Sequence, residues 1–238
     1  MTNVPTKVPW LDDVKRSGRL TLYLDSSLAK SGWERAFKAA ITEFNDLSST
    51  HHLGVTFAKA EEGRSKAHVE AHAKRGDFTV EYPPDFPYDV PPATPKKFDG
   101  RSTHGACIPA LTQIQDQSRV LQFKLVRAFI YVPASPTEKR NGTPSTVGEP
   151  VKLVIAVHEL IHACGIVDND EHSVDDVFCW PRLRMGNTPN EDRLQALGET
   201  YTFPGKPGEP PRVGHRSADM PPIFLKDDTA EKIRKLWT

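Results

Sequence analysis

The clearest alternation of hydrophobic and polar residues lies at 20–25, LTLYLD, where leucine occupies every second position. A period of two is typical of a strand with one buried face. Apolar residues then recur at helical spacing over 33–47, which predicts an amphipathic helix of about four turns that packs on a sheet. Residues 55–58 and 68–73 have the pattern of two further strands. The first part of the chain therefore predicts strands combined with one long helix.

The second half contains one long strand pattern and one apolar helix pattern. Residues 120–132, VLQFKLVRAFIYV, are rich in β-branched and aromatic side chains and predict the longest strand. A polar loop is expected over 133–150. The apolar run 151–164 then predicts a helix that begins near Pro150 and ends at Gly165.

Proline-rich stretches at 81–98 and 204–222 interrupt this order. Proline lacks a backbone donor and has a fixed φ, so we expect extended or irregular chain in both stretches, the second within an irregular region over 186–222. A short helix is predicted from Asp228, with its apolar residues on one face. The order of elements indicates an α+β fold in one compact unit.

The charge balance, the lack of long apolar runs and the few cysteines limit which binding partners and which cellular compartment are expected. The 238 residues include 31 Lys plus Arg and 31 Asp plus Glu, and this balance gives no electrostatic reason to expect nucleic acid or a membrane as partner. No apolar run resembles a Sec-type signal peptide or a membrane span. We expect a soluble monomer that is cytoplasmic or exported by a non-Sec route. The cysteines are too few for a disulfide framework and are expected to be free, buried thiols: Cys107, Cys164 and Cys179.

The helix predicted over 151–164 contains polar residues that are unusual in an apolar run. His158, Glu159 and His162 form the pattern H-E-x-x-H. Histidines four residues apart project from the same helix face, so both can bind one Zn²⁺ at roughly 2.0–2.1 Å. Three buried polar side chains without a partner would be costly. The sequence therefore predicts zinc as cofactor.

Glu159 follows the first histidine, where its carboxylate can reach a water on the metal. Neutral imidazoles leave the zinc enough positive charge to acidify that water. A carboxylate that is not itself a ligand can take the proton and pass it to a leaving amine. We therefore expect Glu159 to be the general base of a zinc-dependent endopeptidase, with peptide or protein as substrate.

The motif continues to Gly165, and H-E-x-x-H-x-x-G resembles the metzincin metallopeptidases. The resemblance implies a turn at the glycine and a third zinc ligand three residues later, here Asp168, as in the snapalysin-like variant. Residue type favours His172, because imidazole is the commoner zinc ligand. Matrixins also often carry serine after the third histidine, as His172-Ser173 does. We prefer His172 and keep Asp168 as the alternative; the other residue could orient a ligand.

The resemblance to matrixins also implies a methionine beneath the zinc, upstream of a terminal helix. Met220, in ADMPP, stands at the matching place, and Met185 is the weaker candidate. The resemblance covers roughly 18–238 in order, but its specific part is limited to 158–165. A long insertion separates His172 from Met220 relative to a typical matrixin.

The resemblance further implies a metzincin-like fold: a twisted mixed sheet, a backing helix, an active-site helix, and an irregular C-terminal subdomain with a terminal helix. Residues 1–17 would be an N-terminal extension and 18–238 one catalytic domain, with subdomains 18–165 and 166–238. A peptide would bind in extended form along an edge strand of the sheet.

Two other functions would use the same residues. One is a zinc amide hydrolase that acts on a non-protein substrate such as a cell-wall peptide. The other is a non-catalytic module in which zinc ties the tail to the core, although such a site has no need of Glu159 beside the metal. His68 and His72 are expected to be exposed histidines rather than a second metal site.

Overall fold

The structure is a computed structural model that describes the sheet, the helices on it and the C-terminal end of the chain. The residues described are 5–76, 78–79, 97–98, 105–115, 119–140, 143–146, 149–166, 177–178, 200–203, 212–215 and 223–238.

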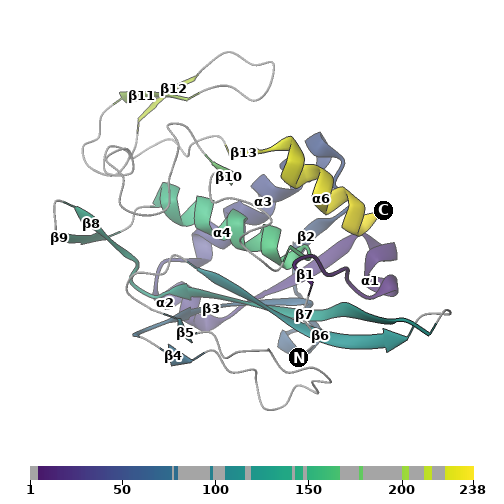
Figure 1. Ribbon diagram of the computed structural model, residues 1–238. Coiled ribbons are helices and arrows are strands. Elements are labelled where there is room, and N and C mark those ends of the chain that lie inside the picture. Colours follow the sequence, from purple (N-terminus) through teal and green to yellow (C-terminus); the bar gives the residue numbers. More distant parts are fainter. Residues whose placement is uncertain are drawn as a thin grey trace.

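The molecule is built on a five-stranded sheet with the strand order β2-β1-β3-β7-β6 (Figure 1). Four of these strands run parallel, and β6 pairs antiparallel with β7. The four parallel strands confirm the strand patterns predicted from the sequence. The bounds are β1 Arg19–Leu24, β2 Thr56–Lys59, β3 Val69–Lys74, β6 Ala106–Gln115 and β7 Leu121–Pro133.

Strand β6 has no counterpart among the sequence predictions. It contains Pro109 and has no regular alternation, but it pairs with β7 from Ala106 opposite Tyr131 to Gln115 opposite Leu121. Proline is tolerated in an edge strand, where a missing donor need not interrupt the sheet. Pairing with the long apolar β7, rather than a local pattern, therefore accounts for β6.

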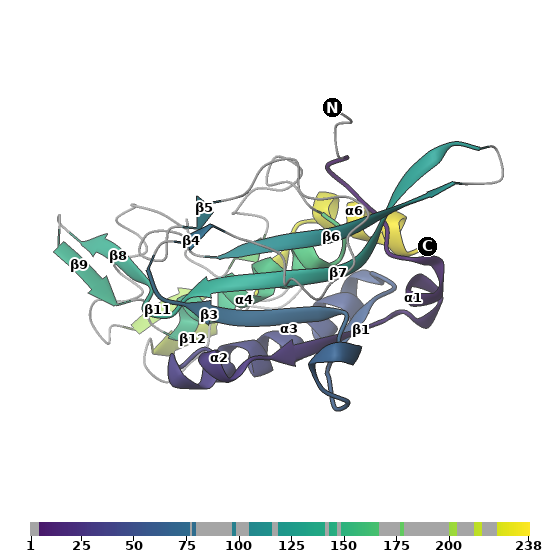
Figure 2. The ribbon, with the colours of Figure 1, turned by 90° about the horizontal axis from the view of Figure 1, so that it is seen from below.

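Helices cover one face of the sheet. Figure 1 shows α3 (Glu34–His51), α4 (Glu149–Ala163) and α6 (Asp227–Trp237) on the same side, and Figure 2 shows the sheet in front of α3 and α4. All three confirm helices predicted from the sequence, and the architecture is α+β. The described part of the chain contains no helix with the length and hydropathy needed to cross a membrane. The short helices are α1 (Asp12–Ser17), α2 (Ser26–Lys30) and the 3₁₀ turn η1 (Arg64–Lys66).

The core fills the space between the sheet and these helices. Helix α3 contributes Phe37 and Phe44, which are fully buried, and α4 packs against α3. Helix α4 is mostly apolar, and every residue from 152 to 163 is buried. A helix with this composition is stable only inside a protein or a membrane. The three polar side chains of the motif are therefore held in the core.

The chain before α1 belongs to the same core. Val8 and Trp10 are fully buried. The amide of Leu125 in β7 donates to the carbonyl of Pro9 at 2.8 Å, and the amide of Leu11 donates to the carbonyl of Leu125 at 3.1 Å. The described part of the predicted N-terminal extension thus packs as an integral part of the domain.

Short strand pairs lie outside the main sheet. The prediction of a polar loop over 133–150 was wrong in part, because β8 and β9 pair there; two polar segments can satisfy their backbone groups by pairing with each other. In the region predicted to be irregular, β11 pairs with β12. The bounds are β4 Phe78–Thr79, β5 Lys97–Phe98, β8 Thr137–Arg140, β9 Thr143–Thr146, β10 Val177–Phe178, β11 Thr200–Phe203, β12 Arg212–His215 and β13 Phe224–Leu225.

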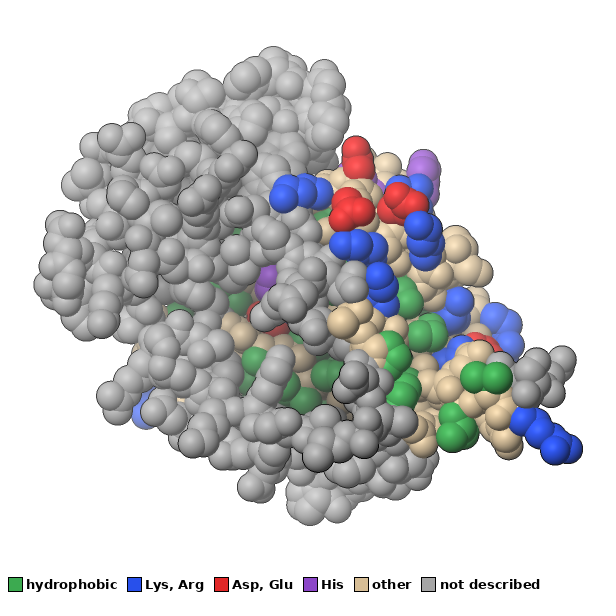
Figure 3. Space-filling view, viewed as in Figure 1, with side chains coloured by type: hydrophobic (Ala, Val, Ile, Leu, Met, Phe, Trp, Pro, Cys, Tyr) green, Lys and Arg blue, Asp and Glu red, His purple; other side chains and the backbone are tan. Residues whose placement is uncertain are grey.

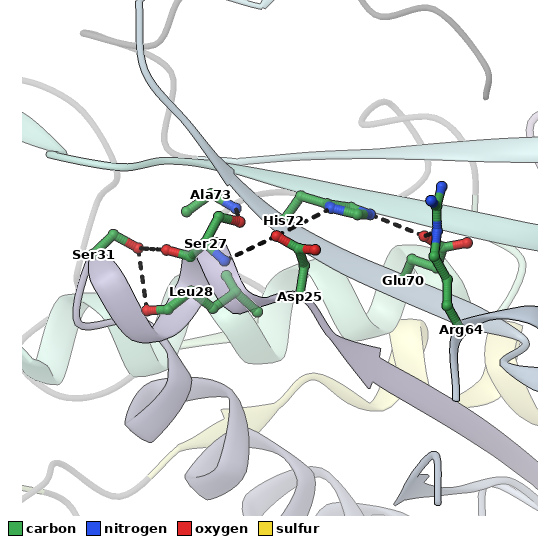
Figure 4. A network of polar contacts seen from close by, with 8 residues as sticks. All are labelled: Asp25, Ser27, Leu28, Ser31, Arg64, Glu70, His72 and Ala73. Atoms are coloured by element: carbon green, nitrogen blue, oxygen red, sulfur yellow. Dashed lines mark hydrogen bonds and ion pairs between the residues drawn. The ribbon is translucent and has the colours of Figure 1, made fainter. Parts of the chain in front are cut away.

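The sheet face opposite α3 and α4 carries a charged cluster around Glu70 (Figure 4). The Glu70 carboxylate lies 2.5 Å from Nη2 of Arg127, accepts from Nε of Arg64 at 2.7 Å, and accepts from Nε2 of His72 at 3.0 Å. Only 2% of the Glu70 side chain is exposed. Burial opposes ionisation, but the hydrogen bonds from His72 and Arg64 and the positive charge of Arg127 outweigh it and lower the pKa of Glu70.

The two histidines expected to be exposed on strand 68–73 are partly buried instead. His72 belongs to the Glu70 cluster, and its ring stacks on Tyr131. The Nδ1 atom of His68 accepts from the backbone amide of Thr21 at 3.0 Å. Glu70 lies on the same strand as His72, but Tyr131 and Thr21 lie on neighbouring strands, which the sequence pattern could not identify as partners.

Candidate metal and catalytic site

Helix α4 brings the two histidines of the motif together. The Nε2 atoms of His158 and His162 lie 3.2 Å apart, and the ring planes are inclined by 79°. Two ligands of a tetrahedral zinc ion, each about 2.0–2.1 Å from it, would be about 3.3–3.4 Å apart. The two imidazoles therefore fit a shared zinc ion without a change of backbone.

A backbone carbonyl orients the second histidine. The Nδ1 atom of His162 lies 2.7 Å from the carbonyl oxygen of Ile166. A carbonyl can only accept, so Nδ1 is the donor and the neutral ring keeps a lone pair on Nε2. Such a hydrogen bond is the usual way in which proteins fix the tautomer and direction of a metal-binding histidine.

All three polar residues of the motif are buried. The exposed fractions are 5% for His158, 2% for Glu159 and 8% for His162. In the space-filling view, histidine and acidic surface comes into view among hydrophobic side chains in the middle of the molecule (Figure 3). A buried carboxylate on the helix that carries the two imidazoles is suited to proton transfer, because electrostatic interactions are stronger out of water.

The C-terminal end of α4 is fixed from both ends of the chain. The indole of Trp10 donates to the carbonyl of Ala163 at 2.8 Å, and the indole of Trp237 donates to the carbonyl of Cys164 at 2.9 Å. The amide of Val8 donates to the carbonyl of Gly165 at 2.8 Å. These bonds satisfy carbonyls that a helix end leaves without intrahelical partners. They also hold the turn that places Ile166 against His162.

Gly165 ends the helix as predicted. Its φ is +115°, which an L side chain rarely adopts, and a Cβ there would lie 2.4 Å from the carbonyl oxygen of Val8. The glycine of the motif is therefore required both by its conformation and by the close approach of the N-terminal segment.

Two residues that support the motif were not identified from the sequence. Trp10 contacts the end of α4 from a segment that has no helical or strand pattern. Gly105, directly before β6, lies against the carboxylate of Glu159. A lone glycine or tryptophan carries no sequence signal for such a contact, because the contact depends on how distant segments meet.

The two described cysteines, Cys107 and Cys164, are buried, as predicted. Cys164 lies in the core; its thiol donates to the carbonyl of Leu160 at 3.3 Å, and burial raises its pKa well above the ordinary value. Cys164 therefore remains a protonated thiol at neutral pH and is unsuited to bind the metal beside His162.

The remaining site predictions lie outside the described residues. These are the two candidates for the third ligand, Asp168 and His172, and the two methionines, Met185 and Met220. Within the described residues no group of three or more His, Cys, Asp or Glu could hold a metal ion. The described pair of histidines thus needs a ligand from elsewhere in the chain to complete a zinc site.

No protein-family model matches the sequence, and no curated protein matches it. The functional interpretation therefore depends on the residues and geometry of α4 and its surroundings.

Proposed function

We propose that the protein is a zinc-dependent endopeptidase. The observation that carries the proposal is the arrangement on α4: two imidazole Nε2 atoms lie 3.2 Å apart, and the residue that follows the first histidine, Glu159, is buried. His158 and His162 hold the zinc together with a third ligand, for which His172 is preferred over Asp168. When bound, zinc lowers the pKa of a water molecule and polarises a carbonyl group.

The residues of the chain supply binding and proton transfer. The Ile166 carbonyl keeps the proton of His162 on Nδ1, so Nε2 faces the metal position. Glu159 takes a proton from the attacking water and passes it to the leaving amine. Because Glu159 is buried, its carboxylate is shielded from bulk water, and this strengthens its interaction with positive charge nearby.

The edge of the sheet supplies a place for an extended peptide. On β2, one edge strand, the side chain of Asn45 bonds to both the amide and the carbonyl of Phe57, at 2.8 and 2.9 Å. The other edge strand, β6, begins immediately after Gly105, which contacts Glu159. This arrangement favours β6 as the strand to which a peptide adds, with its scissile bond near Glu159.

A metzincin-like fold is part of the proposal. It is supported by the mixed sheet with one antiparallel edge strand, by α3 and α4 packed on one face, and by the glycine turn that ends α4. Met220 is proposed to lie beneath the zinc.

Hydrolysis of a quenched fluorescent peptide library tests the function. The wild-type protein should cleave peptides, lose activity on chelation and recover it with zinc. Glu159→Gln should keep the metal and lose at least about 100-fold in kcat, because an amide can bind water but cannot take its proton.

Glu149→Gln is the matched control, because Glu149 lies at the start of the same helix, is partly exposed and forms an ion pair with Lys152. Its kcat should equal that of the wild type. Near-wild-type turnover in Glu159→Gln would show that Glu159 is not the base. A protein that binds zinc but cleaves no peptide would instead fit a non-protein substrate or a structural metal.

A further inference from the structure

Gly105 makes an unusually close approach to Glu159. A Cβ atom built on Gly105 would lie 2.3 Å from Oε1 of Glu159 and 2.8 Å from its Cδ. Side-chain atoms do not pack at such distances, so the glycine lets the backbone before β6 lie directly against the carboxylate. The contact joins an edge strand to the middle of α4, two elements that are distant in the sequence.

The conformation of Gly105 does not by itself require glycine. Gly105 is not one of the described glycines with a positive φ. Its φ is therefore in the range that alanine also adopts. Glycine is therefore required at position 105 because the carboxylate of Glu159 occupies the volume that a side chain would need.

We propose that Gly105 is a positioning residue that holds the Glu159 carboxylate in the place from which it takes a proton. This inference rests on the proposed function of Glu159 as general base. The backbone of α4 is fixed by the core, but the side chain of a glutamate has three rotatable bonds. The backbone of Gly105 lies against the carboxylate and limits these rotations. It also fixes the distance between Glu159 and the start of β6.

A methyl group at position 105 should move the carboxylate rather than the strand. Ala106 is held opposite Tyr131 by the β6–β7 ladder, whereas the far end of a glutamate side chain can rotate. Proton transfer requires heavy atoms within about 2.6–3.2 Å, and a displacement of about 1 Å can cost about 100-fold in rate. The substitution should therefore act on kcat more than on KM.

The kinetic test uses Gly105→Ala in the zinc-loaded, full-length protein. We expect kcat for a cleaved peptide to fall about 100-fold, with KM nearly unchanged and zinc content equal to that of the wild type. Gly76→Ala is the control: its φ is +68° and a Cβ there meets no atom within 4 Å. This control should lose some stability through backbone strain yet keep the wild-type kcat.

A thermal-unfolding cycle tests the contact without relying on activity. Gly105→Ala should lower Tm by several degrees when Glu159 is present, and much less in a Glu159→Ala background, where the colliding carboxylate is gone. This comparison remains informative if Gly105→Ala alone folds poorly, because the double variant should then regain stability.

Three results would overturn the positioning role while leaving the proposed function intact: wild-type kcat in Gly105→Ala, a loss of kcat that accompanies a loss of zinc, or an equal fall in Tm in both backgrounds. A wild-type protein that hydrolyses no peptide would overturn the proposed function, and the positioning role with it. The two failures are thus distinguishable.

Discussion

At the scale of single residues, the chemistry of α4 depends on groups that lie outside the motif. The carbonyl of Ile166 fixes the proton of His162, and Ile166 is itself held by a bridge to Lys7. The histidines and Glu159 could be predicted from their types and spacing. Ile166 and Lys7 could not, because neither residue type signals a role in orienting a ligand.

The third ligand is the sharpest prediction at this scale. If His172 completes the site, His172→Ala should weaken zinc affinity by orders of magnitude. Asp168→Ala should then weaken it only about 10–100-fold, as expected for a residue that orients a ligand. Zinc affinities measured by competition with a chelator decide between them. A larger loss in Asp168→Ala would show that the preference for His172 is wrong, without affecting the roles of His158 and His162.

At the scale of elements, β3 contributes apolar side chains to one face of the sheet and charged or polar side chains to the other. Val69 and Ala71 point into the core with the helices, whereas Glu70 and His72 point to the other face. The alternation of HVEAHA predicts a strand, and the strand is present. The two arginine partners of Glu70 come from η1 and β7, and strand alternation contains no information about them.

The Glu70 cluster predicts a specific dependence of stability on pH. The pKa of Glu70 is lower in the folded protein than in the unfolded chain, so its ionised form contributes stability at neutral pH. That contribution is lost as the pH falls through the folded-state pKa. Glu70→Gln should therefore be less stable than the wild type at pH 7, by about 3–5 kcal/mol. The difference should shrink at pH values below about 4, where glutamate in the unfolded chain is protonated.

Urea unfolding of both proteins across this pH range measures the effect. Glu34→Gln is a suitable comparison, because Glu34 forms an exposed ion pair with Lys38 on the surface of α3. Its removal should change stability little at any pH. A constant difference between Glu70→Gln and the wild type from pH 7 to pH 3 would contradict the role assigned to the Glu70 charge.

At the scale of the whole molecule, hydrophobic patterns in the sequence predicted the individual helices and strands better than the long-range contacts between them. The long helix, the terminal helix and four strands of the main sheet follow hydrophobic periodicity, and all are present. The position of β6 and the burial of the N-terminal segment depend on contacts with β7 and α4. Such long-range contacts depend on how the complete core packs, so they cannot be predicted from the sequence of a single segment.

Segments near the two ends of the sequence meet at the C-terminal end of α4. Trp10 and Trp237 bond to consecutive carbonyls at the end of α4, although they are separated by most of the sequence. The sequence predicts the helix that contains Trp237 but gives no reason to place its indole on α4. In the folded molecule, the N-terminal segment and α6 both hold the helix that carries the proposed zinc ligands.

The proposed binding of zinc by His158 and His162 can be measured by elemental analysis of the protein purified without chelators. We expect one zinc ion per chain in the wild type, the same content in Glu159→Gln, and a large loss in a His158→Ala/His162→Ala double variant. A folded wild-type protein with far less than one zinc per chain, even after incubation with zinc and removal of the excess, would contradict this proposal.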